Sequence, residues 1–240
     1  MMAVATLNET VHERAVAARF DALHGRFKLD VSAEDFRLKG LLASLGPLEG
    51  RCVLDLGCGK GRFAERLAAR GAKVVGVDVA PSMIASARGF PRVLGTARRL
   101  PFSAGAFDAV IAVEVFEHLA STSISAVLIE VRRVLRPGGL VAIVDKNAGS
   151  WNARRRWLPN LVLKRLDERR GLWMYPANSP VRERWFWPGA LLKRLQESFE
   201  GARVEFLLSP AERDHALFQH VPAARLMALW TARAPGDERS

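Results

Sequence analysis

The chain has few cysteines and no long apolar run, and these two absences limit its class. Only Cys52 and Cys58 occur in 240 residues, the first at the start of an expected strand and the second in a glycine-rich turn. A disulfide between them is therefore not expected, and such sparse cysteine fits a reducing cytoplasm. No apolar run reaches the roughly 18 residues of a transmembrane helix. The first residues carry acidic side chains and lack a long apolar core, so we expect no secretory signal peptide.

Acidic residues are scarce beside basic ones, which gives the chain a formal net charge of +11. The surplus is concentrated in residues 151–194, where Asp167, Glu168 and Glu183 are the only acidic residues. A basic cluster of this kind favours phosphorylated substrates, anionic lipid surfaces or nucleic acid as partners. An arginine-rich surface without any partner is an equally good interpretation.

Apolar and helical patterns alternate along the first part of the chain. At 49% hydrophobic residues, the chain is long and apolar enough for one α/β domain with a full core. The alternation of apolar, strand-like runs with helical patterns predicts right-handed βαβ units and a parallel sheet. Ser32 is the expected cap of the second helix, and residues 137–139 are an expected turn. We expect strands at 51–56, 73–77, 91–94, 107–115 and 140–144, and helices at 11–27, 33–45, 62–70, 81–88 and 123–135.

The alternation stops after Lys146. Residues 148–188 contain every tryptophan except Trp230, and their prolines and Gly171 interrupt any long helix, so we interpret them as a cap on the sheet edge. A helix at 189–199 would follow, then a terminal antiparallel pair of strands at 202–208 and 225–233. The predicted fold is α/β, a Rossmann-like, doubly wound, seven-stranded sheet that is mostly parallel. We expect a single domain over 1–240, made of N-terminal helices (1–50), a core (51–147), the cap (148–188) and a C-terminal helix and strands (189–240).

Three glycines at alternate positions mark the most informative turn. An apolar run ends around Asp55, and Gly57, Gly59 and Gly61 follow before a helical pattern begins. Glycine admits positive φ and the close approach of a ligand, and a strand-to-helix turn presents free N–H groups. Asp78 ends the next expected strand, where a carboxylate can accept bonds from ribose hydroxyls. A dinucleotide would also fit, but the spacing is G-x-G-x-G and not G-x-G-x-x-G.

Four further motifs narrow the ligand: residues 100–102 (Leu-Pro-Phe), 107–110 (Phe-Asp-Ala-Val), 114–119 (Glu-Val-Phe-Glu-His-Leu) and 135–139 (Leu-Arg-Pro-Gly-Gly). Together with the glycine turn and Asp78, they closely resemble class I S-adenosylmethionine-dependent methyltransferases. More narrowly they resemble methyltransferase type 11, the branch that includes ubiquinone-pathway O-methyltransferases. The resemblance runs from about residue 36 to residue 144 in order and spacing. It is specific for fold and cofactor and uninformative about the acceptor.

The resemblance implies an S-adenosylmethionine site that releases S-adenosylhomocysteine. Thr96 departs from the pattern, because relatives have an aspartate there. A threonine hydroxyl can still fix a turn or accept a hydrogen bond but brings no charge to adenine N6, so we expect cofactor binding to survive in a weaker form. Met83 could equally belong to the core, and Arg37 to a solvated helix face. The implied contacts are Asp55 to the methionine amino group, Arg37 to the carboxylate, Gly57, Cys58 and Gly59 along the methionyl and ribose portion, Asp78 to the ribose, Val79 and Met83 to adenine, Ala97 and Arg98 to its edge, and Val113 under the methionine.

The sulfonium methyl group is an electrophile, so the protein must align an acceptor with the S–CH₃ bond and exclude water. An oxygen acceptor must also lose its proton, and His118, after the fourth expected strand, is the candidate catalytic base. Glu114, Glu117 and His118 accompany a divalent metal in related quinone enzymes. The same residue types occur widely at these positions in the family without a bound metal, so we expect no metal in this protein. The alternative is that Glu117 and His118 only fix the loop.

We therefore expect a methyltransferase that acts on a small-molecule or lipid-linked acceptor, at oxygen, by in-line displacement. An RNA or protein methyltransferase that docks through the basic insert is the first alternative. The N/D-P-P-Y/F tetrapeptide of amino-nitrogen methylation is missing, since residues 113–116 stand in its place. A non-catalytic S-adenosylmethionine-binding protein is the second alternative, and the intact Gly57, Gly59 and Asp78 argue against it.

The cap combines aromatic and basic residues. Trp151 and Trp157 flank three arginines at 154–156, a pattern suited to an anionic lipid interface. We expect a cytoplasmic protein with peripheral contact to an anionic membrane surface. The aromatic residues of the cap would either shape an apolar acceptor pocket or form a satellite core.

Overall fold

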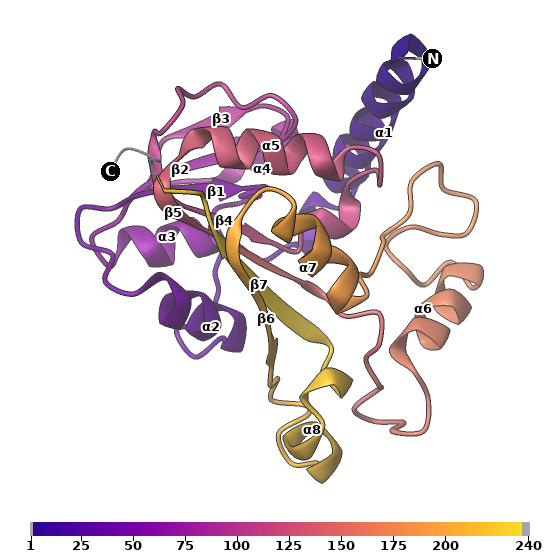
Figure 1. The fold of residues 1–240 in the computed structure, drawn as a ribbon. Helices are drawn as coiled ribbons and strands as arrows, with labels where there is room; N and C mark the ends of the chain where they lie inside the picture. The colour runs from indigo at the N-terminus through magenta and orange to yellow at the C-terminus, as the bar shows by residue number, and fades with distance from the viewer. Residues whose placement is uncertain (1, 237–240) are drawn as a thin grey trace.

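The computed structural model describes residues 2–236, with side chains described from residue 11 onward. Its centre is a seven-stranded sheet in the order β3-β2-β1-β4-β5-β7-β6 (Figure 1). The strands β1 to β5 pair in parallel, whereas β7 runs antiparallel to both β5 and β6. The expected mostly parallel sheet with a terminal antiparallel pair is therefore confirmed. The strands are β1 Cys52–Leu56, β2 Lys73–Asp78, β3 Arg92–Leu94, β4 Phe107–Val113, β5 Leu135–Lys146, β6 Glu200–Leu207 and β7 Met227–Arg233.

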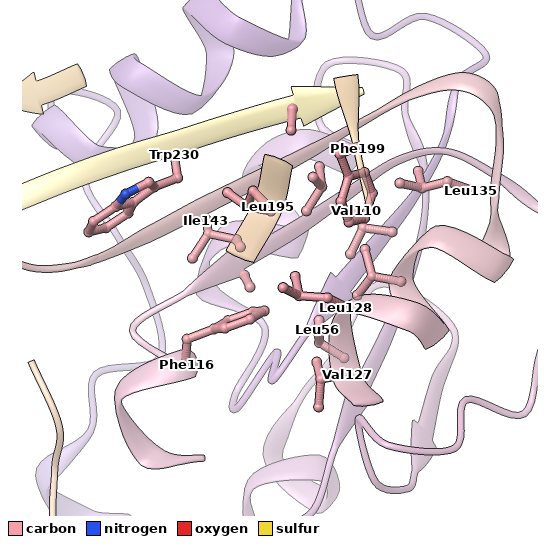
Figure 2. Packing of buried hydrophobic residues seen from close by; sticks show 14 of the residues in the cluster. Leu56, Val110, Phe116, Val127, Leu128, Leu135, Ile143, Leu195, Phe199 and Trp230 are labelled. Atoms are coloured by element: carbon pink, nitrogen blue, oxygen red, sulfur yellow. The ribbon is translucent and has the colours of Figure 1, made fainter. Parts of the chain in front are cut away.

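Helices cover both faces of the sheet, because the side chains of each central strand alternate between two cores. Val53 packs in the cluster that includes α2 and α3, while its neighbour Leu54 packs in the cluster that includes α5 and α7. Figure 2 shows the second cluster, with Trp230 of β7 lying over Ile143 of β5. The helices are α1 Met2–Ala22, α2 Phe36–Leu45, α3 Arg62–Ala68, α4 Pro81–Ser86, α5 Ile124–Val134, α6 Asn160–Arg169, α7 Pro188–Gln196 and α8 Ala216–His220.

Helix α2 begins three residues later than expected, and Ser32 is not its cap. The cap is Asp35, whose Oδ1 accepts hydrogen bonds from the backbone N–H groups of Arg37 (2.9 Å) and Leu38 (3.3 Å). Ser32 instead accepts a bond from the backbone of Glu34 (3.1 Å) in the preceding turn. Asp35 lies directly before the apolar residues of the helix and accepts hydrogen bonds from two of its free N–H groups. It is therefore the more stabilising N-cap, and the helix begins after Asp35 and not after Ser32.

The expected turn at residues 137–139 lies inside β5 as an irregularity. Phe107 pairs with Leu135 and Ala109 pairs with Leu140, so four residues of β5 stand opposite one residue of β4. Gly138 adopts a φ of 70° there, which glycine accommodates without strain. The turn prediction was therefore wrong, because this strand begins earlier and bulges before it enters the core.

Residues 148–188 join β5 to α7 and contain α6. They are tied to the sheet by a parallel bridge between Asn147 and Phe186. In Figure 1, α6 and its flanking loops project beside the sheet. The aromatic residues of this segment differ in solvent exposure: Tyr175 and Trp185 are buried, whereas Trp157 is exposed. Among the described residues, no helix has the length and apolarity to cross a membrane.

Helix α5 offers a matched test of this packing. Leu128 is 2% exposed and faces the core of Figure 2, whereas its neighbour Ile129 is 60% exposed. We expect Leu128→Ala to lower the free energy of unfolding by about 2–5 kcal/mol, because it leaves a cavity. Ile129→Ala should change it by less than about 0.5 kcal/mol. Urea unfolding followed by circular dichroism measures both, and equal losses would contradict the assigned faces.

Candidate functional site

A cavity of about 260 Å³ lies beside the ends of β1, β2 and β4. Ligands of open α/β sheets bind at this carboxyl edge, where neighbouring strands diverge. Every site residue predicted from the sequence lines the cavity except Arg37 and Arg98. The predicted residues in its walls are Asp55, Gly57, Cys58, Gly59, Asp78, Val79, Met83, Ala97, Val113 and His118.

The glycine turn is held by the end of β2. The backbone N–H groups of Gly57 and Cys58 donate to the carbonyl of Val77 at 2.7 and 3.0 Å. Gly57 has a φ of 70°, and a Cβ there would meet Val115 at 2.5 Å. A Cβ on Gly59 would meet nothing within 4 Å, although its φ is 55°. Gly57 is thus required for close packing, while Gly59 leaves backbone open to the cavity.

Asp78 joins the glycine turn to the start of α4. Its Oδ2 accepts the N–H of Gly59 and its Oδ1 accepts the N–H of Ala80, both at 2.8 Å. Each carboxylate oxygen has a second lone pair, so the group can hold the turn and still accept bonds from a diol. Burial raises the pKa of Asp78 despite these bonds.

Asp55 lies beneath the turn and is 3% exposed. Burial, with the nearby charge of Asp78, raises the pKa of Asp55 to about 7. The carboxyl group is therefore poised between its two charge states near neutral pH. A cationic group in the cavity would favour the ionised form.

Helix α1 supplies a wall of the cavity that the sequence analysis missed. His12, Glu13, Val16 and Phe20 all line it. The available signal was the spacing of Val16 and Phe20, which places both on one helix face above Glu13. That spacing indicates an amphipathic helix but does not say what the helix covers.

Glu13 accounts for the placement of Thr96 and Arg98. Its Oε1 accepts the hydroxyl of Thr96 at 2.5 Å, and its two oxygens accept the guanidinium of Arg98 at 2.8 Å each. The backbone N–H of Arg98 donates to Thr96 Oγ1 (3.2 Å), so this hydroxyl does fix the turn as expected. Glu13 thus supplies a carboxylate directly beside Thr96, whose own side chain carries no charge.

Arg37 lies behind the cavity wall. Its guanidinium donates to Glu114 Oε2 at 2.6 Å and to the two Asp35 oxygens at 3.1 and 2.8 Å. Arg62 also donates to Glu114 Oε2 (3.1 Å), and it does line the cavity. Arg37 thus holds the side chain of Glu114, whose backbone φ is 56°. Of the two arginines that pair with Glu114, Arg62 is the one that lines the cavity.

A buried ion cluster lies in the cavity wall near the ends of β4 and β5, two strands away from Asp78 at the end of β2. Lys146 Nζ lies 2.5 Å from Glu117 Oε1, 3.2 Å from Glu183 Oε1 and 3.5 Å from Glu114 Oε1. Burial opposes the charge of Lys146, but the three carboxylates raise its pKa well above the usual value. Burial also raises the pKa of Glu117, with help from Asp145. Burial acts the same way on Glu114, but the charges of Lys146, Arg37 and Arg62 together outweigh it and lower the pKa of Glu114 to about 2.

This cluster does not fit a divalent metal. The ammonium of Lys146 already occupies the point where the three carboxylates converge. Across the described part of the chain, no group of three or more His, Cys, Asp or Glu side chains is arranged to hold a metal ion.

His118 stands beside the ion cluster with both ring nitrogens near a partner. Its Nδ1 lies 3.3 Å from the hydroxyl of Tyr175, and its Nε2 lies 3.5 Å from Glu117 Oε1. Burial lowers the pKa of His118 to about 4, so the ring is neutral at neutral pH. A neutral ring can accept a proton through only one nitrogen, and which one depends on the Tyr175 contact.

The tryptophans of residues 148–188 do not line the cavity. Trp173 and Trp185 donate their indole N–H groups to Glu183 at 3.0 and 2.5 Å. Met174 and Glu183 are the residues of this segment that reach the cavity wall. Two of the aromatic side chains thus position a carboxylate and do not form an apolar acceptor pocket.

Comparisons with known proteins agree with this geometry. Residues 54–143 match the family model described as a methyltransferase domain. A ubiquinone biosynthesis O-methyltransferase of Cereibacter sphaeroides is 34% identical over 190 residues, which cover 66% of this chain and 76% of that protein. The corresponding protein of Sodalis glossinidius is 33% identical over 155 residues, and the match spans 60% of this chain and only 61% of that protein.

Solved structures show the same fold at low identity. An S-adenosylmethionine-dependent methyltransferase from Mesorhizobium loti superposes with a TM-score of 0.62 at 20% identity, covering 83% of this chain and 98% of that one. A Haemonchus contortus phosphoethanolamine N-methyltransferase, solved with phosphoethanolamine and S-adenosylhomocysteine, gives 0.67 at 17% identity, covering 97% and 51%. These two structures support the fold and carry no information about the acceptor.

The raised pKa of Asp55 has a consequence for stability. Because the folded value lies above the unfolded one, its stabilising effect is present below about pH 4 and is lost as pH rises to about 7. The unfolding free energy of the wild type, minus that of Asp55→Asn, should fall by up to about 4 kcal/mol across this range. Urea unfolding at several pH values measures the difference, and parallel curves would contradict the shift.

Proposed function

Since the chain belongs to the family of S-adenosylmethionine-dependent methyltransferases, we propose that it methylates a hydroxyl group of a small-molecule or lipid-linked acceptor. The observation that carries this proposal is a single cavity with two chemically different ends. The strand order β2-β1-β4-β5 separates Asp78 and the glycine turn, toward one end, from Glu117, His118 and Lys146, toward the other. The relatives named as ubiquinone biosynthesis O-methyltransferases support oxygen as the acceptor atom.

The first end suits the cofactor, which supplies an electrophilic methyl group when bound. The free lone pairs of Asp78 would accept the ribose hydroxyls beside the open backbone of Gly59. Val79 and Met83 offer apolar contact to adenine, and Asp55 a carboxylate to the methionine amino group. We assign the cofactor carboxylate to Arg62 and the positioning of Glu114 to Arg37.

The second end suits an acceptor that must be aligned and kept dry. Phe20 packs against the ring of His118, and Leu119 and Met174 also line the cavity with apolar atoms, which exclude water from the reacting groups. His118, the predicted catalytic base, is neutral near pH 7 and lies in the same wall. Its role is to hold or receive the acceptor proton during an in-line displacement.

Cofactor binding tests the proposal directly. We expect S-adenosylmethionine to bind the wild type in a calorimetric titration. Asp78→Ala should weaken this binding at least tenfold, or about 1.4 kcal/mol, because the ribose loses its acceptor. Asp30→Ala is the control, since Asp30 pairs with Arg66 at the surface. If the wild type failed to bind the cofactor, the proposed function would be wrong.

We also propose that residues 148–188 contact an anionic membrane surface, which would give access to a lipid-linked acceptor. Large apolar side chains are exposed there: Trp157 by 75%, Leu172 by 72% and Trp187 by 62%. The arginines at 154–156 are exposed beside them. Aromatic and basic side chains together suit the headgroup region of anionic lipid.

Vesicle sedimentation tests the membrane proposal. We expect the protein to sediment with vesicles of phosphatidylcholine and phosphatidylserine at low salt, and much less with phosphatidylcholine alone. Trp157→Ala should reduce the bound fraction several-fold, whereas Leu94→Ala should not, although Leu94 is 53% exposed on β3. Absence of sedimentation with anionic vesicles would rule the contact out. Salt-sensitive binding to RNA in its place would favour the nucleic-acid alternative.

A further inference from the structure

One buried polar atom in the cavity wall has no hydrogen-bond partner. It is Oε2 of Glu117, and no other buried side-chain nitrogen or oxygen of the described residues shares this condition. Glu117 is 1% exposed and lines the cavity. A buried carboxylate oxygen without a donor is unfavourable, so such an atom commonly marks a place where a ligand completes the bonding.

The neighbouring carboxylates have charged or polar partners. Oε2 of Glu114 accepts two guanidinium groups, from Arg37 and Arg62. Both oxygens of Glu183 accept indole N–H groups. Glu114 Oε1 lies 3.5 Å from the ammonium of Lys146. Among the fully buried side-chain oxygens of the described residues, Oε2 of Glu117 is therefore the one left without a partner.

The other polar groups of Glu117 hold the residue in place. Its Oε1 accepts the ammonium of Lys146 at 2.5 Å. Its backbone N–H donates to Asp145 Oδ2 (3.2 Å), and its carbonyl accepts the N–H of Arg184 (2.7 Å). With Oε1 and both backbone groups engaged, Oε2 remains the free end of a fixed side chain.

We propose that Glu117 Oε2 is the polar anchor of the acceptor, and that it binds an O–H or N–H group that the acceptor must carry. This inference rests on the proposed function, since it concerns the acceptor end of the same cavity. Lys146 is a positioning residue, because it fixes Glu117 through Oε1 and opposes the burial that raises the pKa of Glu117. An O–H or N–H donor at Oε2 favours the same ionised form of the carboxylate. A site built around an unpaired acceptor discriminates strongly against analogues without a donor, so Glu117 determines specificity.

A pair of small probes tests the anchor. Phenol and fluorobenzene have nearly the same shape, but only phenol carries a donor. Both would be titrated into protein saturated with S-adenosylhomocysteine, and their dissociation constants measured by ligand-observed NMR. We expect the wild type to bind phenol at least about tenfold more tightly than fluorobenzene. Equal affinities would overturn the inference, whether or not any variant folds.

Two matched variants locate the preference. Glu117→Gln should reduce the ratio of the two affinities at least about fivefold. The amide oxygen would accept the ammonium of Lys146, so the NH₂ group would take the place of Oε2 and face the hydroxyl group of phenol without accepting from it. Glu183→Gln removes the same charge from the same lysine, and it should leave the ratio within about twofold of wild type. An unchanged ratio in a folded Glu117→Gln, or an equal loss in both variants, would overturn the assignment.

The cofactor titration separates this inference from the proposed function. Affinity for S-adenosylhomocysteine should stay within about twofold of wild type in both variants, because neither residue belongs to the cofactor end. A wild type that does not bind S-adenosylhomocysteine would contradict the proposed function. The ratio of the affinities for phenol and fluorobenzene, measured without S-adenosylhomocysteine, would then still decide the role of Glu117.

Discussion

The ion pairs of Lys146 are the constraint on which the proposed acceptor end of the cavity depends. This one ammonium joins the end of β5 to Glu117 in the turn after β4 and to Glu183 in residues 148–188. Three chain segments that are distant in sequence therefore meet at one charge. Burying a lone ammonium is very costly, and burying lone carboxylates is equally so, hence none of these groups is stable here without the others.

The cofactor end is organised differently, by short backbone bonds within one βαβ unit. The carbonyl of Val77 and the carboxylate of Asp78 receive the N–H groups of the glycine turn, so the end of β2 fixes the turn that follows β1. These bonds need only two adjacent parallel strands and glycines that accept positive φ. Helix α1 then lies across the opening through Glu13, whose ion pair with Arg98 ties it to the turn after β3.

This difference explains what the sequence could predict. Asp55, Gly57 and Asp78 belong to a local pattern of strand, turn and strand, and the structure places all three in the cavity. Glu13 and Lys146 have no such pattern, because their partners lie far away along the chain and only folding brings them together. Arg37 shows the same limit: the sequence predicted it as a contact of the cofactor carboxylate, whereas the structure pairs it with Asp35 and Glu114 behind the cavity wall.

The family match ends at residue 143, and the acceptor end extends beyond it. Lys146, Glu183 and Tyr175 all lie outside the matched residues, whereas the glycine turn and Asp78 lie within them. Residues that shape a shared cofactor are thus held by geometry common to the fold. The residues that we propose to select the acceptor depend on the segment after β5, through the ion pair of Lys146 with Glu183. The acceptor should accordingly be sought among molecules that can satisfy the one free oxygen of Glu117.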